Sequence, residues 1–171
     1  MNYHDIKKID MLNGSGLRVV LFVSGCSHYC EDCQNSITWD ANGGILFDEN
    51  AMQEIKDELK NNWCAGITFS GGDPLYPRNR KKIKEIISEI KKDYPDKNMW
   101  LYTGYKYEDL LEESKDDIYL KYIINNIDIL IDGEFEKDKL SPDKHWVGSS
   151  NQRIIDMKKT LDSETIIELE C

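Results

Sequence analysis

The chain lacks any long hydrophobic segment. No apolar run in its 171 residues approaches the ~20 needed to span a bilayer, and Met1–Lys8 lacks the continuous apolar core of a signal peptide. Basic residues are also in the minority, with 22 Lys and Arg against 32 Asp and Glu and a net charge of −10. This charge disfavours nonspecific binding to nucleic acids or acidic membranes. We therefore expect a cytoplasmic protein that binds neither nucleic acid nor membrane.

Internal repeats, low-complexity tracts and obvious linkers are absent as well. We therefore expect residues 1–171 to form a single domain. A chain of this length is too short for a complete eight-fold β/α barrel, which takes about 250 residues.

The chain has five cysteines, and three of them lie close together. Cys26, Cys30 and Cys33 have the spacing C-x3-C-x2-C and come almost directly after the apolar run Leu17–Val23. In a cytoplasmic protein, clustered cysteines more often bind metal than form disulfides. Three thiolates on one loop can hold three corners of a cubane iron–sulfur cluster. No fourth cysteine lies nearby, so one iron would keep an open coordination site where chemistry can occur.

A zinc site is the competing interpretation, because His28 lies inside the loop and three cysteines with one histidine are an accepted zinc ligand set. His28 is, however, only two residues from both Cys26 and Cys30, a cramped spacing for three ligands on one tetrahedral ion. We expect His28 to be a loop residue that donates a hydrogen bond near the cluster. Cys64 and Cys171 stand alone in the sequence, and we assign them no function.

The rest of the chain alternates apolar strands with amphipathic helices. We predict strands over residues 18–23, 66–69, 99–102, 127–131, 153–156 and 165–169, and helices over 48–60, 77–92 and 107–125. This alternation predicts an α/β fold with a parallel sheet, right-handed crossovers and outer helices. The basic run Arg78–Lys82 is expected to form the solvated face of the second helix, with a docking patch for an acidic redox partner as the alternative.

Every motif whose residues could bind a ligand or take part in a reaction follows directly on a predicted strand. The carboxyl ends of parallel strands share one edge of the sheet, where ligands bind in such folds. The glycines at 71 and 72 would let the main chain approach a ligand closely, and Asp73 adds a carboxylate for a substrate ammonium or a helix cap. The motifs, in order, are the cysteine loop, Ser70–Pro74, Thr103–Tyr105 and Asp132–Gly133.

With these motifs in this order, the sequence resembles the radical S-adenosylmethionine family, and within it the activating proteins of anaerobic ribonucleoside-triphosphate reductases. The resemblance runs from Asn2 to about Arg153. Two places differ from the usual pattern: Gly14–Gly16 stands where Gly-Pro-Gly is common, and Asp32 and Gln34 flank Cys33 where glycine and an aromatic residue or histidine are common. The matching segments are Phe22–Cys26, Ser70–Leu75, Trp100–Tyr105, Asp128–Gly133 and Gly148–Gln152.

The resemblance implies an open, partial barrel of the (β/α)6 type. It also implies that Cys26, Cys30 and Cys33 hold a 4Fe-4S cluster whose open iron binds S-adenosylmethionine. A flavodoxin or ferredoxin type of donor would reduce the cluster. One electron from the reduced cluster would then cleave the S–C5′ bond of S-adenosylmethionine, giving methionine and a 5′-deoxyadenosyl radical. That radical removes a hydrogen from a glycine of the large subunit of the reductase and leaves a glycyl radical there.

The same resemblance implies which residues contact the cosubstrate. Three residues of the cysteine loop would touch its nucleoside, and the motif after the second strand would receive its ammonium end. These two sets are Asp32, Cys33 and Gln34, and Gly71, Gly72 and Asp73, with Thr103 and Asp132 as further contacts at the mouth.

Other functions stay open on the sequence. One is the activation of a different glycyl-radical enzyme, or another small radical S-adenosylmethionine enzyme such as a deazapurine-forming synthase. The chain lacks the cysteine-rich ferredoxin-like insertions of many other activases, which favours the nucleotide-reductase partner. Two non-enzymatic alternatives are an iron–sulfur electron carrier, which needs a fourth cysteine ligand, and a zinc-stabilised interaction module.

Overall fold

The computed structural model describes residues 1–169 of the chain. Within them, no helix is both long and apolar enough to cross a membrane. The elements in chain order are β1 (Asn2–Asp10), β2 (Arg18–Val23), the 3-10 helix η1 (Ser36–Thr38), β3 (Ile45–Leu46), α1 (Glu49–Leu59), β4 (Gly66–Gly71), α2 (Pro77–Asp93), β5 (Asn98–Tyr102), α3 (Tyr107–Glu113), α4 (Ile118–Ile124), β6 (Ile129–Asp132), the 3-10 helix η2 (Lys137–Lys139), β7 (Arg153–Asp156) and α5 (Met157–Ser163).

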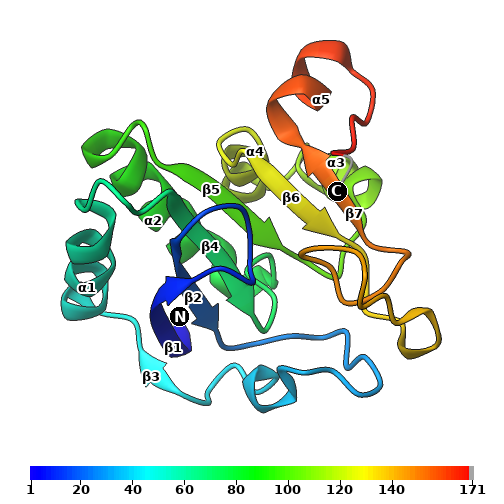
Figure 1. Cartoon of the computed structure of the whole chain (residues 1–171), viewed down its shortest axis with the longest axis horizontal. Coiled ribbons are helices and arrows are strands. Elements are labelled where there is room, and N and C mark those ends of the chain that lie inside the picture. The colour runs from blue at the N-terminus through cyan, green and yellow to red at the C-terminus, as the bar shows by residue number, and fades with distance from the viewer. Residues whose placement is uncertain (170–171) are drawn as a thin grey trace.

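The strands form one mixed sheet in the order β3-β1-β2-β4-β5-β6-β7 (Figure 1). The four central strands β2, β4, β5 and β6 are parallel, as the alternation of strands and helices predicts. The outer strands β1, β3 and β7 are antiparallel to their neighbours. The α/β class and the parallel centre are therefore confirmed, whereas an entirely parallel sheet is wrong.

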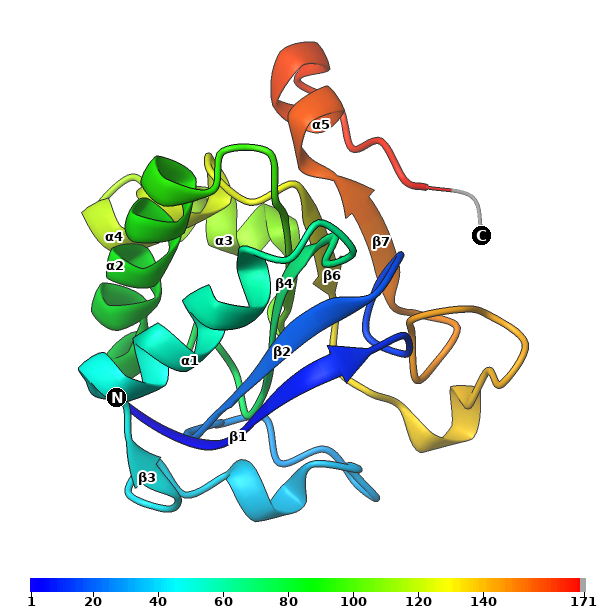
Figure 2. The ribbon, with the colours of Figure 1, turned by 60° about the vertical axis from the view of Figure 1, so that its left-hand side comes forward.

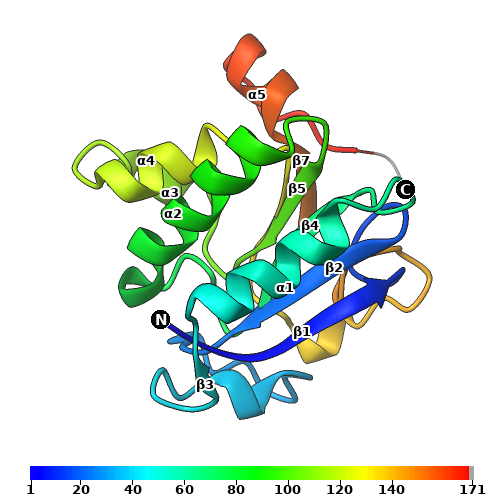
Figure 3. The same cartoon turned by 90° about the vertical axis from the view of Figure 1, so that its left-hand side faces the viewer.

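The helices α1, α2, α3 and α4 cover one face of this sheet (Figure 2), and α1 and α2 run side by side across it (Figure 3). The main core lies between these helices and the sheet, where Ile55 and Ile87 meet Leu21 and Phe69. Strands β2 and β4 are buried along nearly their whole length, which explains their continuous apolar sequences. The opposite face carries a smaller cluster around Trp100.

Helix α2 confirms its predicted apolar face, since Ile83, Ile86, Ile87 and Ile90 are all buried. Its basic first turns differ from the prediction. Arg80 is buried rather than solvated: it donates to the Leu75 carbonyl oxygen at 2.7 Å and pairs with Glu113 at 2.6 Å and Asp117 at 2.9 Å. Asn79 is also buried, and its side chain donates to the Ser24 carbonyl oxygen at 2.9 Å. The run is thus only partly a solvated face.

Two further predicted elements differ in the structure. The region 107–125 is two helices, because Asp117 accepts hydrogen bonds from the amides of Tyr119 and Leu120 and so begins α4 as a new helix. The segment 165–169 is not a strand; it contributes one isolated bridge between Glu168 and Ile155. Strand β1 is absent from the sequence prediction, because its sequence is largely polar and most of it is exposed or half-buried.

The register of the parallel strands brings their carboxyl ends together. Val23, the last residue of β2, lies opposite Gly71, the last residue of β4, and Tyr102 at the end of β5 lies opposite Ile131 of β6. The segment between β2 and β3 runs along this edge of the sheet (Figure 1). The motifs that follow these strands therefore share one edge, as expected.

Candidate functional site

The cysteine loop leaves the end of β2 through a constrained turn. Gly25 has a φ of 101°, and a Cβ there would lie 2.9 Å from the Tyr76 ring, so glycine is required. The loop is held from behind, because the Gly25 amide donates to the Thr38 carbonyl oxygen at 2.8 Å and the Cys26 amide donates to that of Trp39 at 3.1 Å. The segment around η1 thus supports the first cysteine.

The three clustered cysteines line a single cavity of about 120 Å³, called here the thiol pocket. Each is half-buried and free, whereas Cys64 is buried elsewhere and donates to the Gly66 carbonyl oxygen at 3.4 Å. Within residues 1–169, no three His, Cys, Asp or Glu side chains converge on one ion position, and a cubane cluster does not require this because each thiolate binds its own iron. Three thiols around a shared cavity therefore fit such a cluster. Cys171 lies outside the described residues.

Burial changes the pKa of two of these thiols, Cys26 and Cys30. Burial raises the pKa of Cys26 to about 11, although backbone hydrogen bonds from His28 and Tyr29 partly oppose this. Burial also raises the pKa of Cys30, and a backbone hydrogen bond from Phe135 opposes it. Cys26 and Cys30 of the metal-free protein are therefore protonated near neutral pH, and metal binding must displace these two protons.

The two glycines after β4 bring the β4 loop against the cysteine loop. The Gly72 amide donates to the Val23 carbonyl oxygen at 2.8 Å. A Cβ at Gly72 would lie 2.5 Å from the Gly25 carbonyl oxygen, and one at Gly71 would lie 2.7 Å from the Val23 amide. The sequence predicted that the main chain at Gly71 and Gly72 closely approaches a ligand. In the structure it closely approaches the protein's own main chain at Val23 and Gly25. Both glycines also line the thiol pocket.

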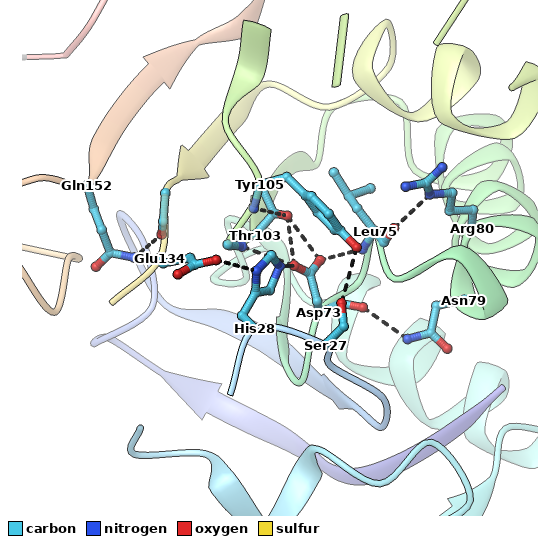
Figure 4. A network of polar contacts seen from close by, with 12 residues as sticks. Ser27, His28, Asp73, Leu75, Asn79, Arg80, Thr103, Tyr105, Glu134 and Gln152 are labelled. Carbon is cyan, nitrogen blue, oxygen red and sulfur yellow. Dashed lines mark hydrogen bonds and ion pairs between the residues drawn. The ribbon is translucent and has the colours of Figure 1, made fainter. Parts of the chain in front are cut away.

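Asp73 is enclosed by protein donors and is only 1% exposed. Its Oδ1 accepts from the Leu75 amide at 2.7 Å and from Thr103 Oγ1 at 3.0 Å, and its Oδ2 accepts from the Gly104 amide at 3.0 Å and contacts His28 Nε2 at 2.8 Å (Figure 4). Thr103, predicted at the mouth, is therefore a partner of Asp73. Both carboxylate oxygens are already engaged, and contact with a cosubstrate ammonium stays a prediction.

His28 lies between two carboxylates. Its Nδ1 is 2.9 Å from Glu134 Oε1, while Nε2 faces Asp73. Burial of the ring by itself lowers its pKa, but the hydrogen bonds and charges of Asp73 and Glu134 outweigh burial and hold the pKa above its usual value. The Tyr105 ring meets the imidazole edge-on, with 4.6 Å between centroids.

Two larger cavities flank the thiol pocket. The polar groove, of about 570 Å³, shares His28, Gly104 and Gly133 with the thiol pocket. Its charged wall consists of Lys106, Asp109, Asp132, Glu134, Glu136, Lys139 and Arg153. The aromatic pocket, of about 390 Å³, shares Cys33 and Gln152 with the thiol pocket and is lined by the rings of Phe22, Tyr102, Phe135 and Trp146.

Comparison with known proteins identifies the family. Residues 12–155 match the family model described as a 4Fe-4S single cluster domain. Proteins named anaerobic ribonucleoside-triphosphate reductase-activating protein are similar over nearly their whole length. That of Enterobacteria phage T4 is 47% identical over 154 residues, covering 90% of this chain and 93% of the relative. Those of Pasteurella multocida (42% over 156 residues, 90% and 96% covered) and Escherichia coli K12 (38% over 154 residues, 89% and 96% covered) are also similar.

The chain belongs to this family of activating proteins.

The 4Fe-4S domain of this family contains every predicted site residue of the chain, since all of them lie between residues 12 and 155. It also decides between the two metals that the cysteine motif leaves open, in favour of iron and sulfide over zinc. An activating protein of this family thus presents its thiols at the edge where the parallel strands end.

The remaining predicted residues lie in different places around the site. Gln34 is exposed and lines the aromatic pocket. Asp32 is exposed and pairs with Lys137 at 2.6 Å, outside the three cavities described above. Asp132 is buried, accepts from the Tyr107 amide at 2.8 Å and from Arg153 Nε at 2.9 Å, and borders the polar groove. Asp32 and Asp132, both predicted to contact the cosubstrate, therefore form contacts within the protein.

The segment between β6 and β7 was not predicted to contribute, yet it borders all three cavities. Glu134 binds His28, Phe135 lines both the thiol and aromatic pockets, and Trp146 lines the aromatic pocket. The sequence offered one indication that this segment could contribute, namely its place directly after the strand end at Asp132–Gly133. It has little regular structure and no spacing pattern, so its contacts could be found only in three dimensions.

Proposed function

We propose that the chain activates an anaerobic ribonucleoside-triphosphate reductase by generating a glycyl radical on its large subunit. The observation that carries this proposal is the shared cavity of Cys26, Cys30 and Cys33, with Cys64 buried elsewhere, in a chain of the activating-protein family. Three thiols with no fourth among the described cysteines leave one iron of a cubane cluster free for a cosubstrate.

Cys26, Cys30 and Cys33 would hold the 4Fe-4S cluster. When bound, the cluster supplies the electron that splits the bond between sulfur and C5′ of S-adenosylmethionine, giving methionine and the 5′-deoxyadenosyl radical. The chain contributes support for the loop, through the Gly25 and Cys26 amides, and enclosure of the thiols. The amides of His28, Tyr29 and Phe135 lie against the sulfur atoms.

S-adenosylmethionine would occupy the thiol pocket together with the adjoining aromatic pocket. Its amino acid end would lie beside the thiols at Gly71, Gly72 and Asp73, which line the thiol pocket. Its adenine would enter the aromatic pocket, where rings provide flat apolar surfaces and Gln34 provides hydrogen bonds. Three further residues would contact the cosubstrate: Asp32, which is next to Cys33, and Thr103 and Asp132, which lie at strand ends.

The fold suits a substrate that is itself a protein. We propose that residues 1–171 act as one domain in which the sheet is an open, partial barrel of the (β/α)6 type. The parallel centre, the antiparallel outer strands and the helices on one face support this. An open side lets the glycine-bearing segment of the large subunit reach the thiol pocket. A flavodoxin or ferredoxin type of protein supplies the electron.

The test is an anaerobic assay of the reconstituted chain. Iron and sulfide are added, followed by dithionite and S-adenosylmethionine, and 5′-deoxyadenosine is measured with and without the reductase. We expect product that depends on reductant and, with the reductase present, a glycyl radical visible by electron paramagnetic resonance. A fully loaded chain that forms neither product with the reductase present would overturn the proposal.

A further inference from the structure

His28 occupies a position that the proposed chemistry does not use directly. Its side chain is 9% exposed and borders both the thiol pocket and the polar groove. We propose that His28 is a positioning residue that ties the cysteine loop to Asp73 and Glu134 and forms the partition between these two cavities. This inference rests on the proposed function.

Both ring nitrogens of His28 are engaged, so the ring has one orientation. Nε2 lies 2.8 Å from Asp73 Oδ2 and Nδ1 lies 2.9 Å from Glu134 Oε1 (Figure 4). The two bonds are unequal, because Asp73 is buried whereas the Glu134 side chain is 56% exposed. The contact with Asp73 should therefore contribute more to the position of the ring.

The neighbouring loop is shaped to receive the ring. A Cβ at Gly104 would lie 2.5 Å from Cδ2 of His28, so a side chain at Gly104 would displace the imidazole. Tyr105 then covers the ring edge-on, and its hydroxyl lies 3.4 Å from Ser27 Oγ, beside His28 in the cysteine loop. Glycine at position 104 is thus explained by the packing of His28.

Through these contacts one side chain connects four strand ends. His28 belongs to the loop after β2, Asp73 follows β4, Gly104 follows β5 and Glu134 follows β6. Glu134 is also next to Phe135, whose amide lies against the Cys30 thiol. The interval between Cys26 and Cys30 is therefore fixed relative to the walls of the pocket that encloses the thiols.

The partition has a consequence for the reaction. The radical is formed on the thiol-pocket side and must be delivered to a glycine of the partner. With the imidazole removed, the cavity of about 120 Å³ joins the groove of about 570 Å³. Water then reaches the thiol side and the cosubstrate is held less firmly. We expect weaker binding of S-adenosylmethionine and more 5′-deoxyadenosine formed for each glycyl radical.

The experiment compares His28→Ala, His28→Gln and Glu134→Ala with the wild-type full-length chain, all reconstituted anaerobically. Glutamine can still donate one hydrogen bond to Asp73, so it should recover part of the loss. His4→Ala is the matched control, because His4 lies in β1 and lines none of the three cavities. The readouts are amide hydrogen exchange in residues 26–33 and 134–136, S-adenosylmethionine affinity, and the ratio of 5′-deoxyadenosine to glycyl radical.

We expect His28→Ala to raise amide exchange in both segments by about tenfold or more, as loss of hydrogen bonds to charged groups implies, and to raise the product ratio above that of wild type. Glu134→Ala should give a smaller change in the same direction. This variant still tests the inference if His28→Ala binds too little iron to be assayed. Wild-type exchange and product ratio in both variants would overturn the inference. A wild-type chain that forms no 5′-deoxyadenosine with the reductase would instead overturn the proposed function, while the exchange measurement would still test the position of His28.

Discussion

At the scale of single residues, the cysteines occupy two different environments. Cys26, Cys30 and Cys33 face the thiol pocket, while Cys64 is buried beside Gly66 at the opposite end of β4. Replacing any one of the first three by alanine should abolish formation of 5′-deoxyadenosine, because the cluster loses a ligand. Cys64→Ala should retain it. Iron content and product formation, measured on the same samples, check this, and full activity of Cys30→Ala would contradict the cluster assignment.

Asp73 gives a second prediction at this scale. Its carboxylate satisfies buried donors from Leu75, Thr103 and Gly104, and Asp73→Ala leaves them without an acceptor. The free energy of unfolding should fall by roughly 3 kcal/mol or more, and Asp73→Asn, which keeps one oxygen, should lose less. Denaturant unfolding of the metal-free chain measures both. An unchanged midpoint together with lost S-adenosylmethionine binding would show that Asp73 serves the cosubstrate alone.

At the scale of elements, one arginine joins α3, β6 and β7. Arg153 binds Glu108 at 2.9 and 2.7 Å and Asp132 at 2.9 Å. The hydrogen bonds from Arg153 lower the pKa of Glu108 to about 2, compared with 4.5 ordinarily. Because the pKa is lower in the folded state, this contribution to stability is present above pH 4.5 and is lost as the pH falls towards 2.

We therefore expect wild type to lose more stability than Glu108→Gln when the pH is lowered through this range. The effect should be small, because Glu108 is more than half exposed and solvent screens the pair. Urea unfolding near neutral pH and at about pH 3 measures the difference. Identical pH dependence of the two proteins would mean that the pair does not stabilise the junction of these elements.

At the scale of the whole molecule, the sheet face away from the helices contains a buried cation. Arg18 is 0% exposed, donates to Thr68 Oγ1 at 2.6 Å and Asn98 Oδ1 at 2.9 Å, and lies over the Trp100 ring at 5.1 Å. It thereby joins β2, β4 and β5 on the face away from the helices. Burial lowers its pKa to about 10, so it is charged at neutral pH.

Arg18→Met should destabilise the fold by about 3 kcal/mol or more, because methionine fills the space but leaves several buried acceptors without donors. Arg78→Met, an exposed change on α2, is the control and should have little effect. Thermal or denaturant unfolding of the two variants provides the comparison. A loss no larger for Arg18→Met than for the control would show that the sheet face away from the helices does not depend on this residue.

Much of the central fold could be predicted, because β2, β4, β5 and α2 have strong apolar patterns of their own. The prediction missed elements whose formation depends on neighbours. The polar β1 is a strand because it pairs with β2 and β3, and the burial of Arg80 follows from carboxylates on the neighbouring elements. Local periodicity contains no signal for either.

The sequence by itself determined the spacing of the thiols, the order of the central strands β2, β4, β5 and β6, and the position of each motif just after a strand, because these depend on residues close together in the chain. Only the tertiary structure decided what those motifs touch. His28 meets Asp73 across 45 residues and Glu134 across 106. Contacts over such separations exist only after the parallel strands pair in register, because this pairing brings their carboxyl ends to one edge.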